Sequence, residues 1–98
     1  MPINPKIKEL EGQRGVLQIP LVLHQNGEIL YGKLYNNKPL VEISNNSTAK
    51  RALKLLLKHN LVVERNSGNG SKAIYYRLTD KGKRFARLIK EMEKLLEE

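Results

Sequence analysis

The spacing of apolar residues changes once along this chain, and the change separates helical segments from a pair of strands. Apolar residues three and four positions apart share one face of a helix, and they predict helices over residues 12–26, 28–36, 47–60 and 80–97. From residue 61 to residue 78 the period becomes two, which is typical of strands with one buried face. The predicted order is helix, helix, helix, β-hairpin, helix.

Local signals set the limits of the N-terminal elements. In the first eleven residues, Asn4 followed by Pro5 favours either a short helix or a loose arm. The next predicted helix is apolar on several sides, so we expect it to be buried. Pro20 cannot donate a backbone hydrogen bond, so this helix must kink at Pro20 or begin near it. Gly27 is its expected end.

The helix predicted over 47–60 combines an apolar stripe with a basic face. Ser47 is its expected N-cap, because a serine hydroxyl can accept one of the unpaired amide protons of the first turn. Asn60 tolerates the left-handed conformation that ends a helix. The stripe contains Ala49, Ala52, Leu53, Leu56 and Leu57, and the opposite face carries Lys50, Arg51, Lys54 and Lys58.

The hairpin leads directly into the last helix. Residues 61–65 and 73–78 are the predicted strands, joined by a polar turn rich in glycine, asparagine and serine. Thr79 is the expected cap of the last helix, with Asp80 in its first turn. Basic residues come early in this helix and acidic ones late, against the helix dipole. Either the basic residues face an anionic partner, or the order is an accident of composition.

The charge of the chain is concentrated in its middle. The net charge is +8, and residues 43–90 carry 12 basic and 2 acidic side chains, against 5 and 4 in residues 1–42. Such a field attracts polyanions, of which nucleic acid is the commonest. A lysine-rich solubility surface is the alternative, although it would not need so few acidic residues over this stretch.

Several classes of function find no support in the sequence. There is no cysteine, His24 and His59 have no partners at metal-ligand spacing, and neither a nucleophile with its base nor a phosphate-binding glycine loop is present. We therefore expect no catalysis, no metal and no cofactor. No apolar run approaches the roughly 20 residues that cross a membrane, and the N-terminus has no signal-peptide core, so we expect a cytoplasmic protein.

The order of elements predicts an α+β, mostly α, winged helix-turn-helix fold with a β-hairpin wing and a C-terminal dimerisation helix. TAKRALKLLLKHNLVVER, residues 48–65, resembles the recognition helix and first wing strand of multiple-antibiotic-resistance-type and related winged-helix transcriptional regulators. YYRLTDKGK, residues 75–83, resembles their second wing strand and the start of the helix after it. The small archaeal and archaeal-virus members are closest in length. Two departures are Asn60 in place of a usual glycine, and a longer stretch between Leu34 and Ile43.

The resemblance implies DNA contacts from the third helix, the wing and its flanks. Lysine and arginine can donate to guanine, and serine and threonine can bond a phosphate or a base. Lys58 is expected to be a solvent or phosphate group only. Groove contacts are expected from Ser47, Thr48, Lys50, Arg51 and Lys54, wing contacts from Arg65, Asn69, Ser71, Lys72 and Arg77, and a phosphate contact from Tyr31.

Domains of this size commonly bind DNA as symmetric dimers. We expect a homodimer, with residues 1–11 as an arm or short helix, 12–79 as the DNA-binding domain and 80–98 as the dimerisation helix. The alternative is that the last helix packs only on its own domain. The expected dimer interface consists of Phe85, Leu88, Ile89, Met92, Leu95 and Leu96.

The predicted function is a sequence-specific regulator of transcription that binds double-stranded DNA. Two alternatives remain open, namely an architectural protein that coats DNA without sequence preference and a winged helix that binds another protein. RNA binding is also open, although no aromatic platform for single strands is evident. The resemblance allows a small-molecule effector at the dimer interface, but no cluster of polar residues marks a site for one.

Overall fold

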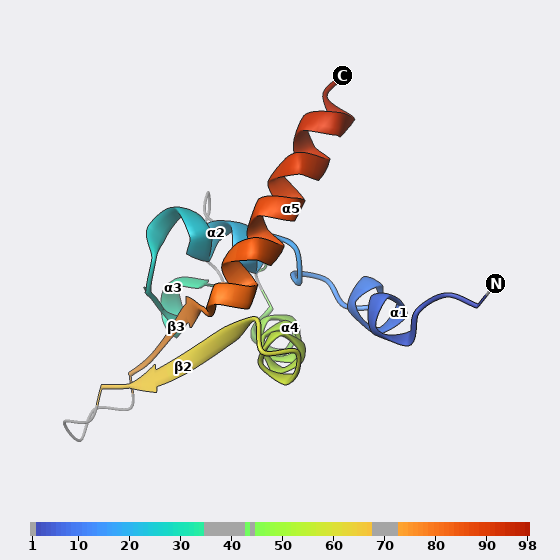
Figure 1. Ribbon diagram of the computed structural model, residues 1–98. Coiled ribbons are helices and arrows are strands. Elements are labelled where there is room, and N and C mark those ends of the chain that lie inside the picture. Colours follow the sequence, from blue (N-terminus) through green and yellow to red (C-terminus); the bar gives the residue numbers. More distant parts are fainter. Residues whose placement is uncertain (1, 35–42, 44, 68–72) are drawn as a thin grey trace.

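The structure is a computed structural model that describes residues 2–34, 43, 45–67 and 73–98. Its strands form one antiparallel sheet in the order β1-β3-β2 (Figure 1). The expected fold class, a mostly helical chain with a β-hairpin, is confirmed. The elements are α1 (Pro5–Glu11), α2 (Gln18–Asn26), β1 (Ile29–Leu30), α3 (Tyr31–Leu34), α4 (Asn46–Lys58), β2 (Val62–Asn66), β3 (Ile74–Leu78) and α5 (Asp80–Leu96).

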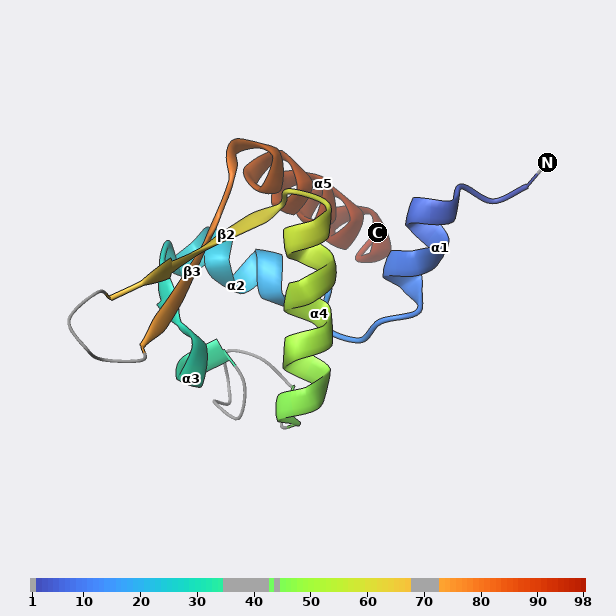
Figure 2. The ribbon, with the colours of Figure 1, turned by 90° about the horizontal axis from the view of Figure 1, so that it is seen from below.

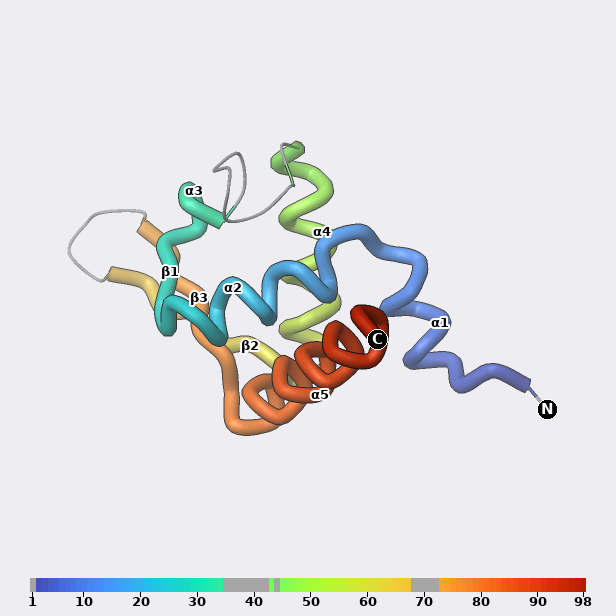
Figure 3. The backbone as a smooth tube through the Cα atoms, turned by 90° about the horizontal axis from the view of Figure 1, so that it is seen from above, coloured from blue at the N-terminus to red at the C-terminus, as the bar shows by residue number. Residues whose placement is uncertain are grey.

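One apolar core joins α2, α4, the sheet and the first half of α5. Figures 2 and 3 show α4 and α5 beside α2, with the hairpin at one end of the molecule and α1 at the other. Removal of these side chains from water is the main term that favours folding. The largest fully buried side chains are Ile19, Leu23, Leu34, Leu53, Leu56, Val62 and Pro20.

α2 resolves the difficulty that Pro20 poses. The helix begins at Gln18, after Leu17 as N-cap, so Pro20 is its third residue. The first amide groups of a helix have no carbonyl partner within it, and a proline there costs no hydrogen bond. The expected helix start near Pro20 is confirmed, and the prediction of a helix over residues 12–17 is wrong, because these residues form turns before α2. Gly27 ends the helix with a φ of 79°, as predicted.

The helix predicted over 28–36 is wrong in its first half. Ile29 and Leu30 form β1, which pairs with Tyr76 and Tyr75 of β3. The helical part that the structure describes is α3, four residues from Tyr31 to Leu34. The left-handed turn at Gly27 redirects the chain toward the hairpin, where Ile29 is buried by strand pairing instead of helix packing. Residues 35–42 lie outside the described part.

Asn45, and not Ser47, caps α4. The Asn45 side-chain oxygen accepts hydrogen bonds from the amide groups of Ser47 (2.8 Å) and Thr48 (3.3 Å). The prediction of Ser47 as N-cap is therefore wrong by two residues, because asparagine and serine cap about equally well and both stand at this boundary. α4 ends at Lys58 with His59 as C-cap, and Asn60 has the predicted left-handed conformation with a φ of 59°.

The start of α5 is fastened to the turn between α4 and β2. The Thr79 hydroxyl donates to the Asn60 carbonyl (2.6 Å) and accepts from the amide of Gly82 (2.9 Å), which confirms Thr79 as the helix cap. The Thr79 amide donates to the Leu61 carbonyl (3.1 Å). A Cβ atom on Gly82 would lie 1.9 Å from the same carbonyl oxygen, so only glycine fits there.

We predict that G82A destabilises the fold by about 2–4 kcal/mol, because the added methyl group meets backbone and not a flexible side chain. Urea denaturation followed by circular dichroism measures this difference. G32A is the matched control, since nothing lies within 4 Å of a Cβ atom at Gly32 in α3. That substitution should be neutral or stabilise by up to about 1 kcal/mol. Equal effects of the two substitutions would contradict the assigned close approach.

Candidate nucleic-acid interface

The exposed face of α4 carries three cations for which the described residues provide no ion-pair partner. Lys50, Arg51 and Lys54 are exposed, and within the described ranges none of their side chains takes part in a hydrogen bond or ion pair. Ala49 and Ala52, on the opposite face, have no exposed surface. The apolar face therefore fixes the helix to the core, and the cations point to solvent on a rigid support.

The N-terminal end of α4 is held by hydrogen bonds from two other segments. The Tyr31 hydroxyl donates to the side-chain oxygen of Asn46, and the Gln13 side chain donates to the Thr48 carbonyl at 3.4 Å. Ser47 is exposed, and because Asn45 provides the cap, the Ser47 hydroxyl is not needed for that role. Tyr31 thus acts as a brace for α4, and its predicted phosphate contact stays a prediction.

Arg65 is bound near the outer end of β2, one residue before the strand ends. Its guanidinium makes two hydrogen bonds to the carboxylate of Glu28, at 2.7 Å and 3.0 Å, and lies 4.6 Å from the ring centre of Tyr75. The hydrogen bonds from Arg65 hold the pKa of Glu28 below its ordinary value, and those to Glu28 raise the pKa of Arg65. Such paired geometry ties β2 to the start of β1.

Of the other four residues predicted to make wing contacts, the structure describes one. Arg77 is exposed on β3 and faces Val63 of β2 in the strand register. It also lowers the pKa of Glu28 through its charge, less than Arg65 does. Asn69, Ser71 and Lys72 lie outside the described residues, so their contacts stay predictions.

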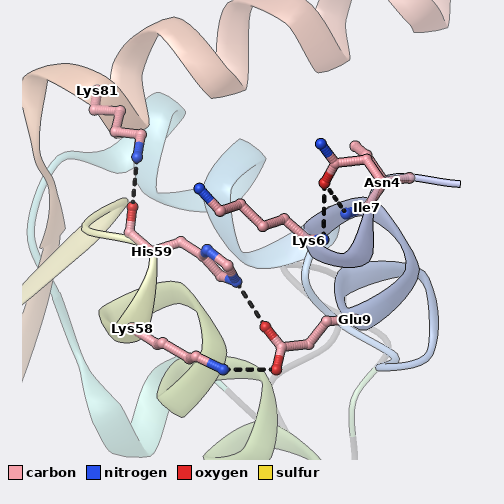
Figure 4. Close-up of polar contacts among 7 residues, drawn as sticks. All are labelled: Asn4, Lys6, Ile7, Glu9, Lys58, His59 and Lys81. Atoms are coloured by element: carbon pink, nitrogen blue, oxygen red, sulfur yellow. Dashed lines mark hydrogen bonds and ion pairs between the residues drawn. The ribbon is translucent and has the colours of Figure 1, made fainter.

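The C-terminal end of α4 is tied to α1 through Glu9 (Figure 4). The Glu9 carboxylate bonds Lys58 at 2.7 Å and His59 at 2.8 Å, and hydrogen bonds from Lys58 and then His59 lower the pKa of Glu9. Lys81 of α5 donates to the His59 carbonyl at 3.0 Å. Sequence reasoning missed Glu9, because only the fold brings α1 beside a residue 50 positions away.

The first eleven residues are therefore not a loose arm throughout. Asn4 caps α1 through hydrogen bonds to the amide groups of Lys6 (2.8 Å) and Ile7 (3.4 Å), which confirms the helical alternative (Figure 4). No residue of α1 is buried. The helix is attached through Glu9 and through Leu10, which packs against the core.

The six residues predicted for a dimer interface lie in different environments on α5. Ile89 is 4% exposed and belongs to the core of its own domain, so it does not offer a free surface. Phe85 is partly buried against the same core. The other four, Leu88, Met92, Leu95 and Leu96, are exposed.

Two solved structures are similar to this arrangement of elements. One is the adhesin competence repressor AdcR from Streptococcus pyogenes, with a TM-score of 0.65 over 88% of this chain and 17% sequence identity. The other is a mutant of ZitR from Lactococcus lactis in its apo form, with a TM-score of 0.64 over 93% of this chain and 20% identity. The fold is a winged helix. The similar regions span 61% and 67% of those two chains.

In the terms of the winged helix, α4 is the helix in the recognition position and the β2–β3 hairpin is the wing. No family model matches this chain, and no curated protein matches it significantly. Among the described residues, no helix is long and apolar enough to cross a membrane. Within the same ranges, no group of His, Asp or Glu side chains is arranged to hold a metal ion.

Tyr76 links the wing to the core, and the ionisation of its phenol group provides a test of this packing. It is 7% exposed, its hydroxyl donates to Glu64 at 3.1 Å, and its ring lies 6.1 Å from that of Tyr31. Burial, and then the hydrogen bond to Glu64, raises its pKa to about 12. The folded state therefore holds the phenol proton more tightly than the unfolded chain, whose tyrosines have a pKa of about 10.

We predict that the free energy of unfolding is independent of Tyr76 below about pH 10 and falls by about 2 to 3 kcal/mol between about pH 10 and 12. Y76F removes the phenol and should flatten this part of the pH profile. Y75F is the control, because it keeps the Tyr76 hydroxyl and the aromatic ring beneath Arg65. Denaturant midpoints measured across this range check the prediction, and a Y76F profile as steep as that of the unsubstituted protein would contradict it.

Proposed function

We propose that this protein is a transcriptional regulator that binds double-stranded DNA sequence-specifically as a homodimer. In this proposal α4 enters the major groove, and the wing contacts the flanking backbone or minor groove. The observation that carries the proposal is the exposed face of α4, where Lys50, Arg51 and Lys54 have no partner within the described residues while the opposite face is buried.

The chemistry of this face suits DNA better than a protein surface. An arginine can pair with guanine O6 and N7, and lysines contact guanine or phosphate. A helix about 10 Å in diameter fits the major groove. The name of one similar protein, the repressor AdcR, agrees with this role, but at 17% identity the argument rests on the cations of α4.

The described basic residues of α4 and the wing form two groups, those whose side chains bind a carboxylate and those whose side chains have no hydrogen-bond or ion-pair partner among the described residues. We propose a different role for each group. Lys58 and Arg65 already bind carboxylates, and they would need to exchange Glu9 or Glu28 for a phosphate. We therefore assign base and phosphate contacts to Ser47, Thr48 and the cations of α4, and secondary contacts to Arg65, Arg77 and Tyr31. Asn69, Ser71 and Lys72 complete the proposed wing contact.

Dimerisation would double the contact with DNA. One recognition helix covers only a few base pairs, and two of them about 34 Å apart read successive half-sites on one side of the duplex. The exposed apolar residues of α5 provide the surface for a second copy. Binding to a palindrome follows from the two-fold symmetry of such a dimer.

We predict that K50A, R51A and K54A together weaken binding to a selected duplex at least about hundredfold at ~0.1 M salt, with a salt slope lower by about 0.9 for each phosphate that is no longer bound. Fluorescence anisotropy titrations at several salt concentrations measure both quantities. K58A and K94A are controls that each remove one positive charge, from the paired end of α4 and from the far end of α5.

Two results would contradict parts of this proposal. Affinity of the triple variant equal to that of K94A would exclude α4 as the DNA-binding element. No binding of the unsubstituted protein to any duplex at low salt would favour a protein-interaction module. Selection of binding sites from random duplexes distinguishes sequence-specific binding from binding without sequence preference. A sequence-specific regulator should enrich a palindromic site, whereas an architectural protein should enrich no site.

A further inference from the structure

α5 extends beyond the domain (Figure 1). Its projecting half exposes an apolar stripe. Leu88 is 59% exposed, Met92 45%, Leu95 65% and Leu96 82%. Beside this stripe lies an apolar groove of about 700 Å³ between α1 and α5. Its apolar lining includes Ile7, Leu10, Leu17, Phe85, Leu88 and Met92.

The stripe has the spacing of a helix that pairs with another helix. Phe85, Leu88, Met92 and Leu95, which we call the α5 seam, follow one another at intervals of three, four and three residues. This is the alternation of the a and d positions in a coiled coil. Ile89 lies on the side of α5 that packs into its own core, so the seam faces outward beside it.

The charges along α5 identify the partner and its direction. Residues 80–90 carry five basic and one acidic side chain, whereas residues 91–98 carry one basic and four acidic. Two parallel copies would place basic against basic and acidic against acidic. Two antiparallel copies would place each basic half beside an acidic half. Their helix dipoles would also point in opposite directions, which is the favourable arrangement for two helices side by side. The order that is unfavourable within one helix becomes favourable in such a pair.

We infer that two copies of this chain pair through antiparallel α5 helices, an inference that rests on the proposed homodimer and specifies its geometry. Phe85 packs against Leu95 of the partner subunit, and Leu88 packs against Met92 of the partner subunit. The C-terminal turn of each α5 enters the groove between α1 and α5 of the other copy. Because the interface is two-fold symmetric, every contact between two different residues occurs twice.

This register brings one pair of opposite charges together beside the seam. Residues that precede the a positions by one lie at the edge of the seam, and here they are Arg84 and Glu91. Glu98, two residues beyond the end of α5, follows Glu91 at the same interval of seven residues. When Phe85 packs against Leu95 and Leu88 against Met92 of the partner subunit, Arg84 lies opposite Glu98 of the partner subunit. Glu91 lies opposite Glu91 of the partner subunit near the two-fold axis, which costs some stability. A parallel pair would instead place Arg84 opposite Ile89 of the partner subunit.

Charge exchange tests the register. R84E alone and E98R alone should each weaken the dimer roughly tenfold, because each turns two attractive pairs into repulsive ones. The double variant R84E/E98R should restore the affinity of the unsubstituted dimer. K83E and E97R are matched controls, with the same charge changes on the opposite side of α5, and should leave the dimer unchanged. E91Q should tighten it. Sedimentation equilibrium measures all these dissociation constants.

The outcomes separate this inference from the proposed function. If the double variant stays as weak as the single ones, the antiparallel register is wrong and the homodimer stands. If the unsubstituted protein is monomeric at concentrations that saturate a selected duplex, the homodimer fails and this inference fails with it.

The absence of native cysteine allows a second test. In the antiparallel register, the two copies of Leu95 are ten residues apart along the seam, about 15 Å, which exceeds the reach of a disulfide. L95C alone should therefore remain uncrosslinked on oxidation, whereas a mixture of L88C and M92C should form crosslinked dimers. A parallel pair would crosslink L95C with itself. That result, or no crosslink in the mixture, would overturn the inference.

Discussion

The close contact between the first turn of α5 and the turn that follows α4 is the constraint on which the other elements depend. Asn60 adopts a left-handed conformation, and Thr79 bonds the carbonyls of Asn60 and Leu61 while Gly82 lies against the latter. One short region therefore sets the direction of α4, of the wing and of α5 together. The orientation of α4 relative to α5 depends on this junction, because the chain turns from one element to the next at these residues.

The cations of the molecule serve two different purposes. Lys58, Lys81 and Arg65 bond protein oxygens and hold α1, α5 and the wing to the body of the domain. Within the described part of the chain, the side chains of Lys50, Arg51 and Lys54 on α4 take no such role. The number of basic residues therefore overstates how many cations are available to bind a polyanion. The available cations are those whose side chains lack a carboxylate or carbonyl partner. Exposed ion pairs stabilise weakly, so the first group acts chiefly through geometry.

Much of the fold follows from local sequence, and the exceptions have physical reasons. The period of apolar residues located α4, both long strands and α5, and Thr79 and Asn60 acted as predicted. The prediction for Ile29 and Leu30 is wrong because two apolar neighbours fit either period, and their partners in β3 are more than 40 residues away. The ion pairs that Glu9 and Glu28 form could likewise not be predicted, because no local sequence pattern indicates which distant cation a carboxylate will contact. The exposed cations of α4 were predictable because they depend on one helix alone.

The central position of β3 has a consequence for how the chain acquires its structure during synthesis. β3 is the last strand of the sheet to be made, yet it pairs with both of the others. Until it leaves the ribosome, Ile29 and Val62 lack the strand with which β1 and β2 pair. Local helices can form earlier, but the cooperative step must wait for residues 74–82. A translational pause before that segment would prolong the exposure of two apolar strand edges, and with it the risk of aggregation.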